Sequence, residues 1–111
     1  MVDFHGWELP VQYESILAEH KQCRERVAVF DTSHMGQFLL RGPRAGADLA
    51  RLLTHDATQL AVGKSRYGLL LDEDGGIRDD TILLRLGEEE FLLVVNAGPL
   101  EDDLRWVGSH L

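Results

Sequence analysis

The chain has 111 residues, enough for one domain or part of one, and 44% of them are hydrophobic, enough to build a core. Its formal net charge of -8, without any basic stripe, argues against a nucleic-acid partner. No apolar run reaches the ~20 residues that a membrane-spanning helix needs, so no membrane partner is expected. The single cysteine, Cys23, cannot form an internal disulfide, and the N-terminus has no secretory signal pattern. We therefore expect a reducing, cytoplasmic location.

The first predicted elements are a loop and a helix. Residues 1–13 show no steady hydrophobic period, and Gly6 and Pro10 favour a loop whose aromatic side chains pack on another part of the protein. Residues 14–26 are predicted to form a helix with Ser15 as its N-cap. A cysteine on the apolar side of such a helix is most often a small core residue. That side comprises Ile16, Leu17, His20 and Cys23.

Two strands and a second helix are predicted next. The short apolar run of residues 27–31 predicts a strand, and residues 35–41 predict another, which ends at Gly42-Pro43. Residues 44–54 are predicted to form a helix, whose apolar side comprises Ala47, Leu49, Ala50, Leu52 and Leu53.

Three further strands complete the predicted sheet. Residues 67–71, 80–86 and 91–97 are joined by short polar turns, which predicts an antiparallel meander. A last helix is predicted from Pro99 onward, and its end at Leu111 carries no cap, so we expect the chain to be part of a longer domain. Its apolar side comprises Leu100, Leu104 and Val107. This order of elements predicts an α+β fold: a mostly antiparallel sheet with helices on one face.

The densest group of chemically active side chains lies in residues 72–80. The acids and glycines of residues 72–76 are typical of a solvated hairpin turn, and their spacing does not match a calcium-binding loop. Asp79 and Asp80 differ, because neighbouring side chains on a strand point to opposite faces. One of them must point into the sheet's interior face or a cleft beside it, where a carboxyl group can hold a proton near neutral pH.

Other polar residues have both a structural and a functional interpretation. His34 could act as an acid–base group, although Ser33 and His34 at such a break more often bond the backbone of a turn. Tyr67 and Asn96 are expected at half-buried strand positions. The other histidines are scattered, with no cysteine partner, so no metal site is expected.

Four segments of the chain form a recognisable set: residues 2–13 (VDFHGWELPVQY), 30–36 (FDTSHMG), 73–80 (EDGGIRDD) and 93–97 (LVVNA). Together they resemble one known family, the T proteins (aminomethyltransferases) of the glycine cleavage system. They occur in the family's order and at its spacing over nearly the whole chain. The resemblance implies that residues 1–111 are a partial N-terminal folate-binding domain.

The family's function supplies further expectations. Its members transfer a one-carbon unit from an aminomethyl group, carried on the lipoyl arm of H protein, to tetrahydrofolate and release ammonia. The resemblance implies that Asp80 is the catalytic carboxylate, which orients the folate and assists proton movement. It also implies folate contacts at Met35, Leu39, Tyr67, Asp80, Ile82 and Asn96.

The chain departs from the family at two positions and leaves other functions open. Arg78 stands where an apolar residue is usual, and Leu84 where a folate-lining tyrosine is often found. Arg78 could lower the pKa of a neighbouring aspartate or project into solvent. The alternatives to the enzyme are a truncated, non-catalytic folate-binding module and a folate-binding accessory protein.

Overall fold

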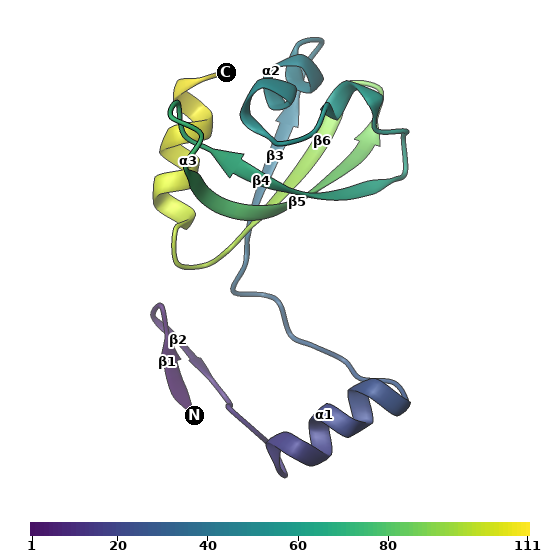
Figure 1. Ribbon diagram of the computed structural model, residues 1–111, viewed down its shortest axis with the longest axis vertical. Coiled ribbons are helices and arrows are strands. Elements are labelled where there is room, and N and C mark those ends of the chain that lie inside the picture. Colours follow the sequence, from purple (N-terminus) through teal and green to yellow (C-terminus); the bar gives the residue numbers. More distant parts are fainter. The chain divides into compact units, whose positions relative to one another are not determined.

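The computed structural model describes residues 1–111 and divides into two compact units, Met1–His34 and Met35–Leu111 (Figure 1). The first unit contains β1 (Val2–Phe4), β2 (Trp7–Leu9) and α1 (Ile16–Glu25). The second contains β3 (Gly36–Arg41), α2 (Ala45–Leu52), the 3-10 helix η1 (Ala57–Gln59), β4 (Ser65–Leu71), β5 (Ile77–Gly87), β6 (Glu90–Val95) and α3 (Leu100–Ser109). No helix is both long and apolar enough to cross a bilayer.

The predicted loop at the N-terminus is in fact a β-hairpin, so that prediction was wrong. Strands β1 and β2 pair antiparallel, with Phe4 opposite Trp7. The two turn residues, His5 and Gly6, both have positive φ (53° and 85°), the backbone form that a tight two-residue hairpin favours. The Asp3 carboxylate accepts from the Gly6 N–H at 3.0 Å and fixes the turn.

Helix α1 confirms the predicted helix and its cap, because Ser15 Oγ accepts from the Ala18 N–H at 3.1 Å. The Glu19 side chain also accepts from the N–H groups of Tyr13 and Glu14, both at 2.8 Å. The predicted core role of its apolar side was wrong, since no residue of α1 is buried and Cys23 is exposed. Local capping therefore defines this helix without a core beneath it.

The strand predicted at residues 27–31 is absent. Those residues have no strand partner, and Val29 is 96% exposed. An apolar run becomes a strand only when another strand pairs with its backbone. The turn that follows is present: the Asp31 carboxylate accepts from the Ser33 N–H at 2.9 Å.

The second unit confirms the predicted α+β fold. Its four strands are antiparallel in the order β3-β6-β5-β4, so β4, β5 and β6 form the predicted meander and β3 joins at β6 (Figure 1). Residues from α2 and α3 share one buried core with side chains from every strand, so both helices cover the same face of the sheet. That core comprises Leu40, Ala45, Leu49, Leu52, Leu53, Ala57, Leu60, Leu70, Leu83, Phe91, Leu93, Val95 and Val107.

Helix α3 shows one difference from the predicted pattern. Pro99 is its N-cap residue and Val107 is buried as expected, but Leu104 is exposed and Asp103 is buried in its place. The indole Nε1–H of Trp106 donates to the Leu71 carbonyl at 3.1 Å and fastens the helix to β4. A carboxyl group thus occupies the helix face that packs on the sheet.

Candidate functional site

The candidate site is the face of the four-stranded sheet that α2 and α3 do not cover, and we call it the open face. Strand register aligns side chains across all four strands on this face. One row contains Gln37, Val94, Ile82 and Tyr67, and the next contains Leu39, Leu92, Leu84 and Ser65. Tyr67 is 63% exposed, and Leu39 and Ile82 are exposed as well. Three of the predicted folate contacts, which are far apart in sequence, therefore lie on one surface.

The aspartate pair of β5 divides between the two faces, as strand alternation predicted. Asp79 points into the core side and is only 7% exposed, whereas Asp80 is exposed on the open face. Asp80 lies opposite Leu69 of β4. On its own strand it is two residues from Ile82, so the two side chains point to the same face. The predicted catalytic carboxylate is thus accessible, and its neighbour is the buried member of the pair.

Asn96, directly after β6, links the two aspartates. Its backbone N–H donates to Asp79 Oδ2 at 2.8 Å, and its Nδ2 lies 2.8 Å from Asp79 Oδ1. The same Nδ2 lies 2.9 Å from Asp80 Oδ1 and 3.0 Å from the Asp80 carbonyl oxygen. The amide nitrogen is fully engaged, which leaves the amide oxygen of Asn96 as a hydrogen-bond acceptor. This arrangement fixes both polar groups expected to meet a ligand.

The last of the predicted contacts, Met35, directly precedes β3. It is half-buried and precedes Gly36, which pairs with Val95, so Met35 lies level with Asn96 at the sheet's edge. All six predicted contacts consequently belong to the second unit.

Sequence reasoning missed Asp103, although its position offered a signal. Asp103 is three residues from Leu100 and four from Val107, so it lies on the apolar side of the helix. It is only 1% exposed, and burial raises its pKa to about 7, with the negative charge of Asp79 adding to the increase. A carboxyl group with that pKa holds a proton over part of the neutral range.

The unusual Arg78 lies beside this acid. Its guanidinium carbon is 4.4 Å from the centroid of the Trp106 ring, a cation–π contact. Its charge acts to lower the pKa of Asp103, the effect expected on a neighbouring aspartate, but burial outweighs it. Leu84, the other departure, is half-buried between Leu92 and Ser65 on the open face.

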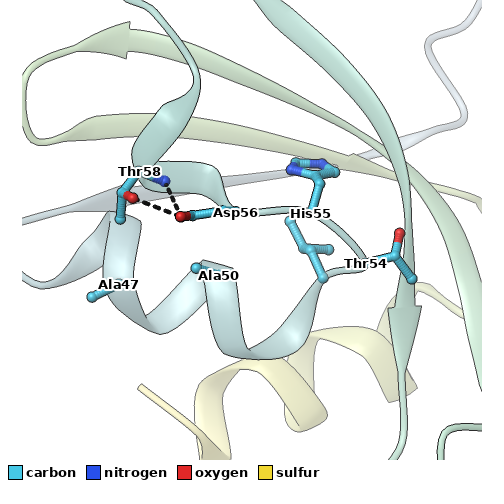
Figure 2. A pocket seen from close by; sticks show the side chains of 7 residues that line it. Ala47, Ala50, Thr54, His55, Asp56 and Thr58 are labelled. Carbon is cyan, nitrogen blue, oxygen red and sulfur yellow. Dashed lines mark hydrogen bonds between the residues drawn. The ribbon is translucent and has the colours of Figure 1, made fainter.

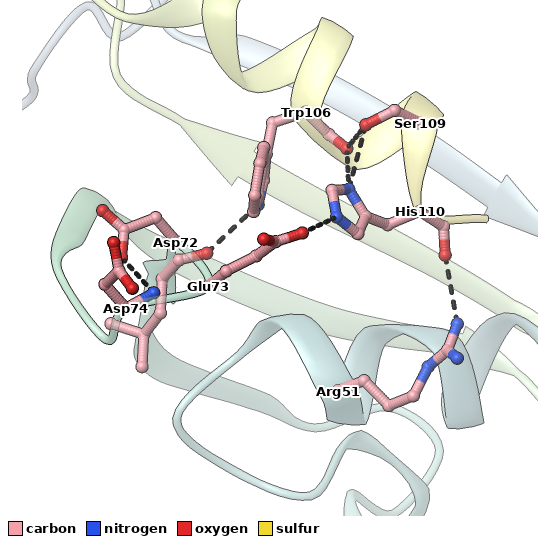
Figure 3. A network of polar contacts seen from close by, with 8 residues as sticks. Arg51, Asp72, Glu73, Asp74, Trp106, Ser109 and His110 are labelled. Atoms are coloured by element: carbon pink, nitrogen blue, oxygen red, sulfur yellow. Dashed lines mark hydrogen bonds and ion pairs between the residues drawn. The ribbon is translucent and has the colours of Figure 1, made fainter.

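The acidic turn of residues 72–76 has a structural role. Asp72 Oδ1 accepts from the N–H groups of Asp74 and Gly76 at 3.0 and 2.6 Å. Glu73 lies 3.9 Å from His110, whose backbone carbonyl accepts from Arg51 at 3.1 Å (Figure 3). These contacts join the turn to the ends of α3 and α2.

A shallow hollow beside α2 is separate from the predicted residues (Figure 2). Asp56 accepts from the N–H and hydroxyl of Thr58 at 2.9 and 2.6 Å, which lowers the pKa of the Asp56 carboxyl. Burial, followed by the charge of Arg66, lowers the pKa of His55, whose ring lies so close to Gly68 that a Cβ there would be 2.5 Å from it. Asp56 thus serves as the cap of η1, and His55 packs against β4.

His34, the other candidate acid–base group, packs within the first unit. Its ring centroid lies 5.6 Å from that of Phe4 in an edge-to-face contact. Together with the Asp31–Ser33 turn, this contact favours a structural role for the segment.

Comparisons with known proteins match the whole chain. The family model described as the GCVT N-terminal domain covers residues 1–111. Aminomethyltransferase from Chloroherpeton thalassium is 47% identical over 110 residues, and that from Symbiobacterium thermophilum is 48% identical over 110 residues. These matches cover 99% and 98% of this chain but only 30% and 29% of the relatives. The chain therefore spans about 30% of the length of these relatives.

A solved structure agrees with the sequence matches. Glycine cleavage system aminomethyltransferase T from Bartonella henselae is similar with a TM-score of 0.91 and 41% sequence identity. The match covers 98% of this chain and 30% of that one.

Proposed function

Because this chain belongs to the GCVT N-terminal domain family, we propose that it is the N-terminal part of a glycine cleavage aminomethyltransferase and binds tetrahydrofolate on the open face. One observation carries the proposal. The predicted contacts lie on or directly beside four different strands and are far apart in sequence, yet strand register and alternation put them on one face of a single sheet, where Asn96 contacts Asp80. The family resemblance implied these residues individually, and strand register provides an independent reason for their proximity.

The chemistry of the open face suits a pterin. Leu39 and Ile82 supply exposed apolar surface, and Tyr67 supplies an aromatic ring against which a flat heterocycle can pack. The Asp80 carboxylate and the amide oxygen of Asn96 supply hydrogen-bond acceptors for the N–H groups at a pterin's edge. A mixed surface of this kind both holds and orients the ring.

Asp80 is the group that we assign to the reaction. Transfer moves the CH₂ unit from the lipoyl sulfur and the amino nitrogen to two folate nitrogens, which lose their protons; the products are ammonia, a thiol and methylenetetrahydrofolate. A carboxylate beside the attacking nitrogen can accept its proton and pass it to a leaving group. The exposed position of Asp80 allows this contact, while the hydrogen bond from Asn96 fixes its orientation. The lipoylated H protein is the proposed donor.

A binding module without catalysis is the second candidate. The observation that favours it is that all six proposed folate contacts lie within the second unit, and only Asp80 among them is assigned a part in the reaction. Folate binding by this chain without transfer from aminomethylated H protein would identify this second function.

Calorimetric titration of the 111-residue chain with tetrahydrofolate tests the binding proposal. Asp80→Asn keeps the size of the side chain but removes its charge, and we expect affinity to fall by about ten- to a hundredfold, the value of one charged hydrogen bond. Asp74→Asn, in the exposed β4–β5 turn, removes the same charge away from the open face and should bind normally. A folded chain that does not bind, or equal losses in both variants, contradicts the proposal.

A further inference from the structure

Two buried carboxyl groups meet beneath the candidate site. Asp79 on β5 and Asp103 on α3 are 7% and 1% exposed, and the charge of Asp79 acts directly on Asp103. Asp48, the other buried aspartate, accepts from Arg44 and Arg51 at 3.1 and 2.9 Å. Neither oxygen of Asp103 accepts a hydrogen bond. Asp103 therefore lacks the compensation that Asp48 has, and a buried acceptor of that kind needs an explanation.

A shared proton provides that explanation. Two carboxylates offer only acceptors, and like charges at close range cannot both remain ionised in a core. Both oxygens of Asp79 already accept from Asn96. Asp103 has no donor, so the proton resides on Asp103, and its O–H can donate to Asp79.

We propose that Asp103 is a positioning residue for the open face: its protonated carboxyl donates to Asp79, which holds Asn96 against Asp80. The contacts run in order from α3 through β5 to the residue after β6 and back to the open side of β5. The part of this inference that concerns ligand binding rests on the proposed function. The coupling between Asp103 and Asn96 needs no ligand: it is argued from the burial of Asp79 and Asp103, the unpartnered oxygens of Asp103 and the two hydrogen bonds from Asn96 to Asp79.

The pairing makes the site sensitive to pH. The ionisable groups that act on Asp103 are Asp79 and Arg78 of β5 and Asp102 of its own helix. Loss of the proton leaves two negative charges that repel one another, which Arg78 only partly offsets. Asp79 then shifts, and the amide of Asn96 loses its fixed orientation beside Asp80.

Nuclear magnetic resonance of the 111-residue chain tests the coupling without any folate. The side-chain carboxyl carbons and the Asn96 side-chain amide are followed as the pH is raised through neutrality. We expect one carboxyl group to titrate near pH 7, with the Asn96 signals moving at the same midpoint. Asp103→Asn replaces the O–H donor by an N–H donor that does not titrate. In this variant the chemical shifts of the Asn96 side-chain amide should keep their low-pH values over the whole pH range.

A matched control and the contradicting result complete the experiment. Asp102→Asn removes the same charge from an exposed neighbour and should keep the titration. Asn96 signals that stay constant while a carboxyl group titrates would overturn the proposal, as would the absence of any carboxyl titrating near neutrality. Should Asp103→Asn not fold, the wild-type titration still decides the question.

Tetrahydrofolate binding adds a second readout that separates this proposal from the proposed function. If only the protonated pair binds, the apparent Kd rises about tenfold for each pH unit above the midpoint in the wild type, and stays flat in Asp103→Asn. If the Asn96 signals move with pH in a chain that binds no folate, the proposed function is contradicted but the coupling is supported. If the chain binds folate with an affinity that does not change with pH, and the Asn96 signals stay constant, the proposed function is supported but the coupling is contradicted.

Discussion

Residues 1–34 and 35–111 form structure by different means. The first unit contains no buried residue, and local hydrogen bonds define its hairpin and helix. The second unit contains the entire buried core, to which every strand and both helices contribute. Cooperative stability comes chiefly from apolar burial, so we expect residues 35–111 to unfold as one unit.

The same contrast separates the functional proposals from the scaffold. All six proposed folate contacts lie in the unit that has a core, where strand register fixes their spacing. Rigid elements hold a binding surface more accurately than isolated local structure does. The exposed aromatic residues of the first unit, such as Phe4 and Trp7, have no comparable framework.

Truncating one side chain in each unit should give the largest difference in stability between the two units. Leu83 is fully buried in β5, and Leu83→Ala should lower the free energy of unfolding by about 2–5 kcal/mol, because it leaves a cavity. Phe30→Ala, at a position 70% exposed, should change it by less than about 0.5 kcal/mol. Urea unfolding followed by circular dichroism measures both. Similar losses would show that residues 1–34 share the core.

The buried pair Asp79 and Asp103 should make the stability of the second unit depend on pH, with a smaller effect than the Leu83 truncation. The pKa of Asp103 is raised by folding from 3.8 to about 7, so its contribution is fully present below about pH 4 and is lost as the pH rises through 7. Wild-type stability should therefore fall by on the order of 2–4 kcal/mol over this interval. Asp103→Asn should remove most of that slope, whereas Asp102→Asn should keep it. Urea midpoints at several pH values measure the slope, and parallel curves for wild type and Asp103→Asn would contradict the assignment.

Sequence alone predicted the second unit well because its pattern and its tertiary environment agree. Alternation along β5 predicts that Asp79 and Asp80 point to opposite faces, and one is buried while the other is exposed. Short polar turns between the last three strands determined their antiparallel order. The register that brings Tyr67 and Ile82 opposite each other was not predicted and is known from the structure.

The predictions failed where a residue's role depends on what lies beside it. The apolar run of residues 27–31 has no partner strand, and the apolar side of α1, including Cys23, has nothing packed on it within its own unit. Asp103 was overlooked because an acid in a helix is usually solvated, and only the contact with Asp79 gives it a role. The hairpin was missed because its signal is two turn residues, His5 and Gly6, between very short strands.

The smallest predicted effect concerns the cap of α1. Ser15→Ala removes the acceptor for the Ala18 N–H and should destabilise this helix by about 1 kcal/mol. A ten-residue helix without a buried face is marginal, so the change should speed amide exchange throughout α1. Ser15→Asn, which keeps a capping oxygen, should restore the slower exchange. The urea midpoint of residues 35–111 should stay the same in both variants, because no core residue depends on this cap. A lower midpoint in Ser15→Ala alone would mean that α1 stabilises the second unit, and that the two regions unfold together.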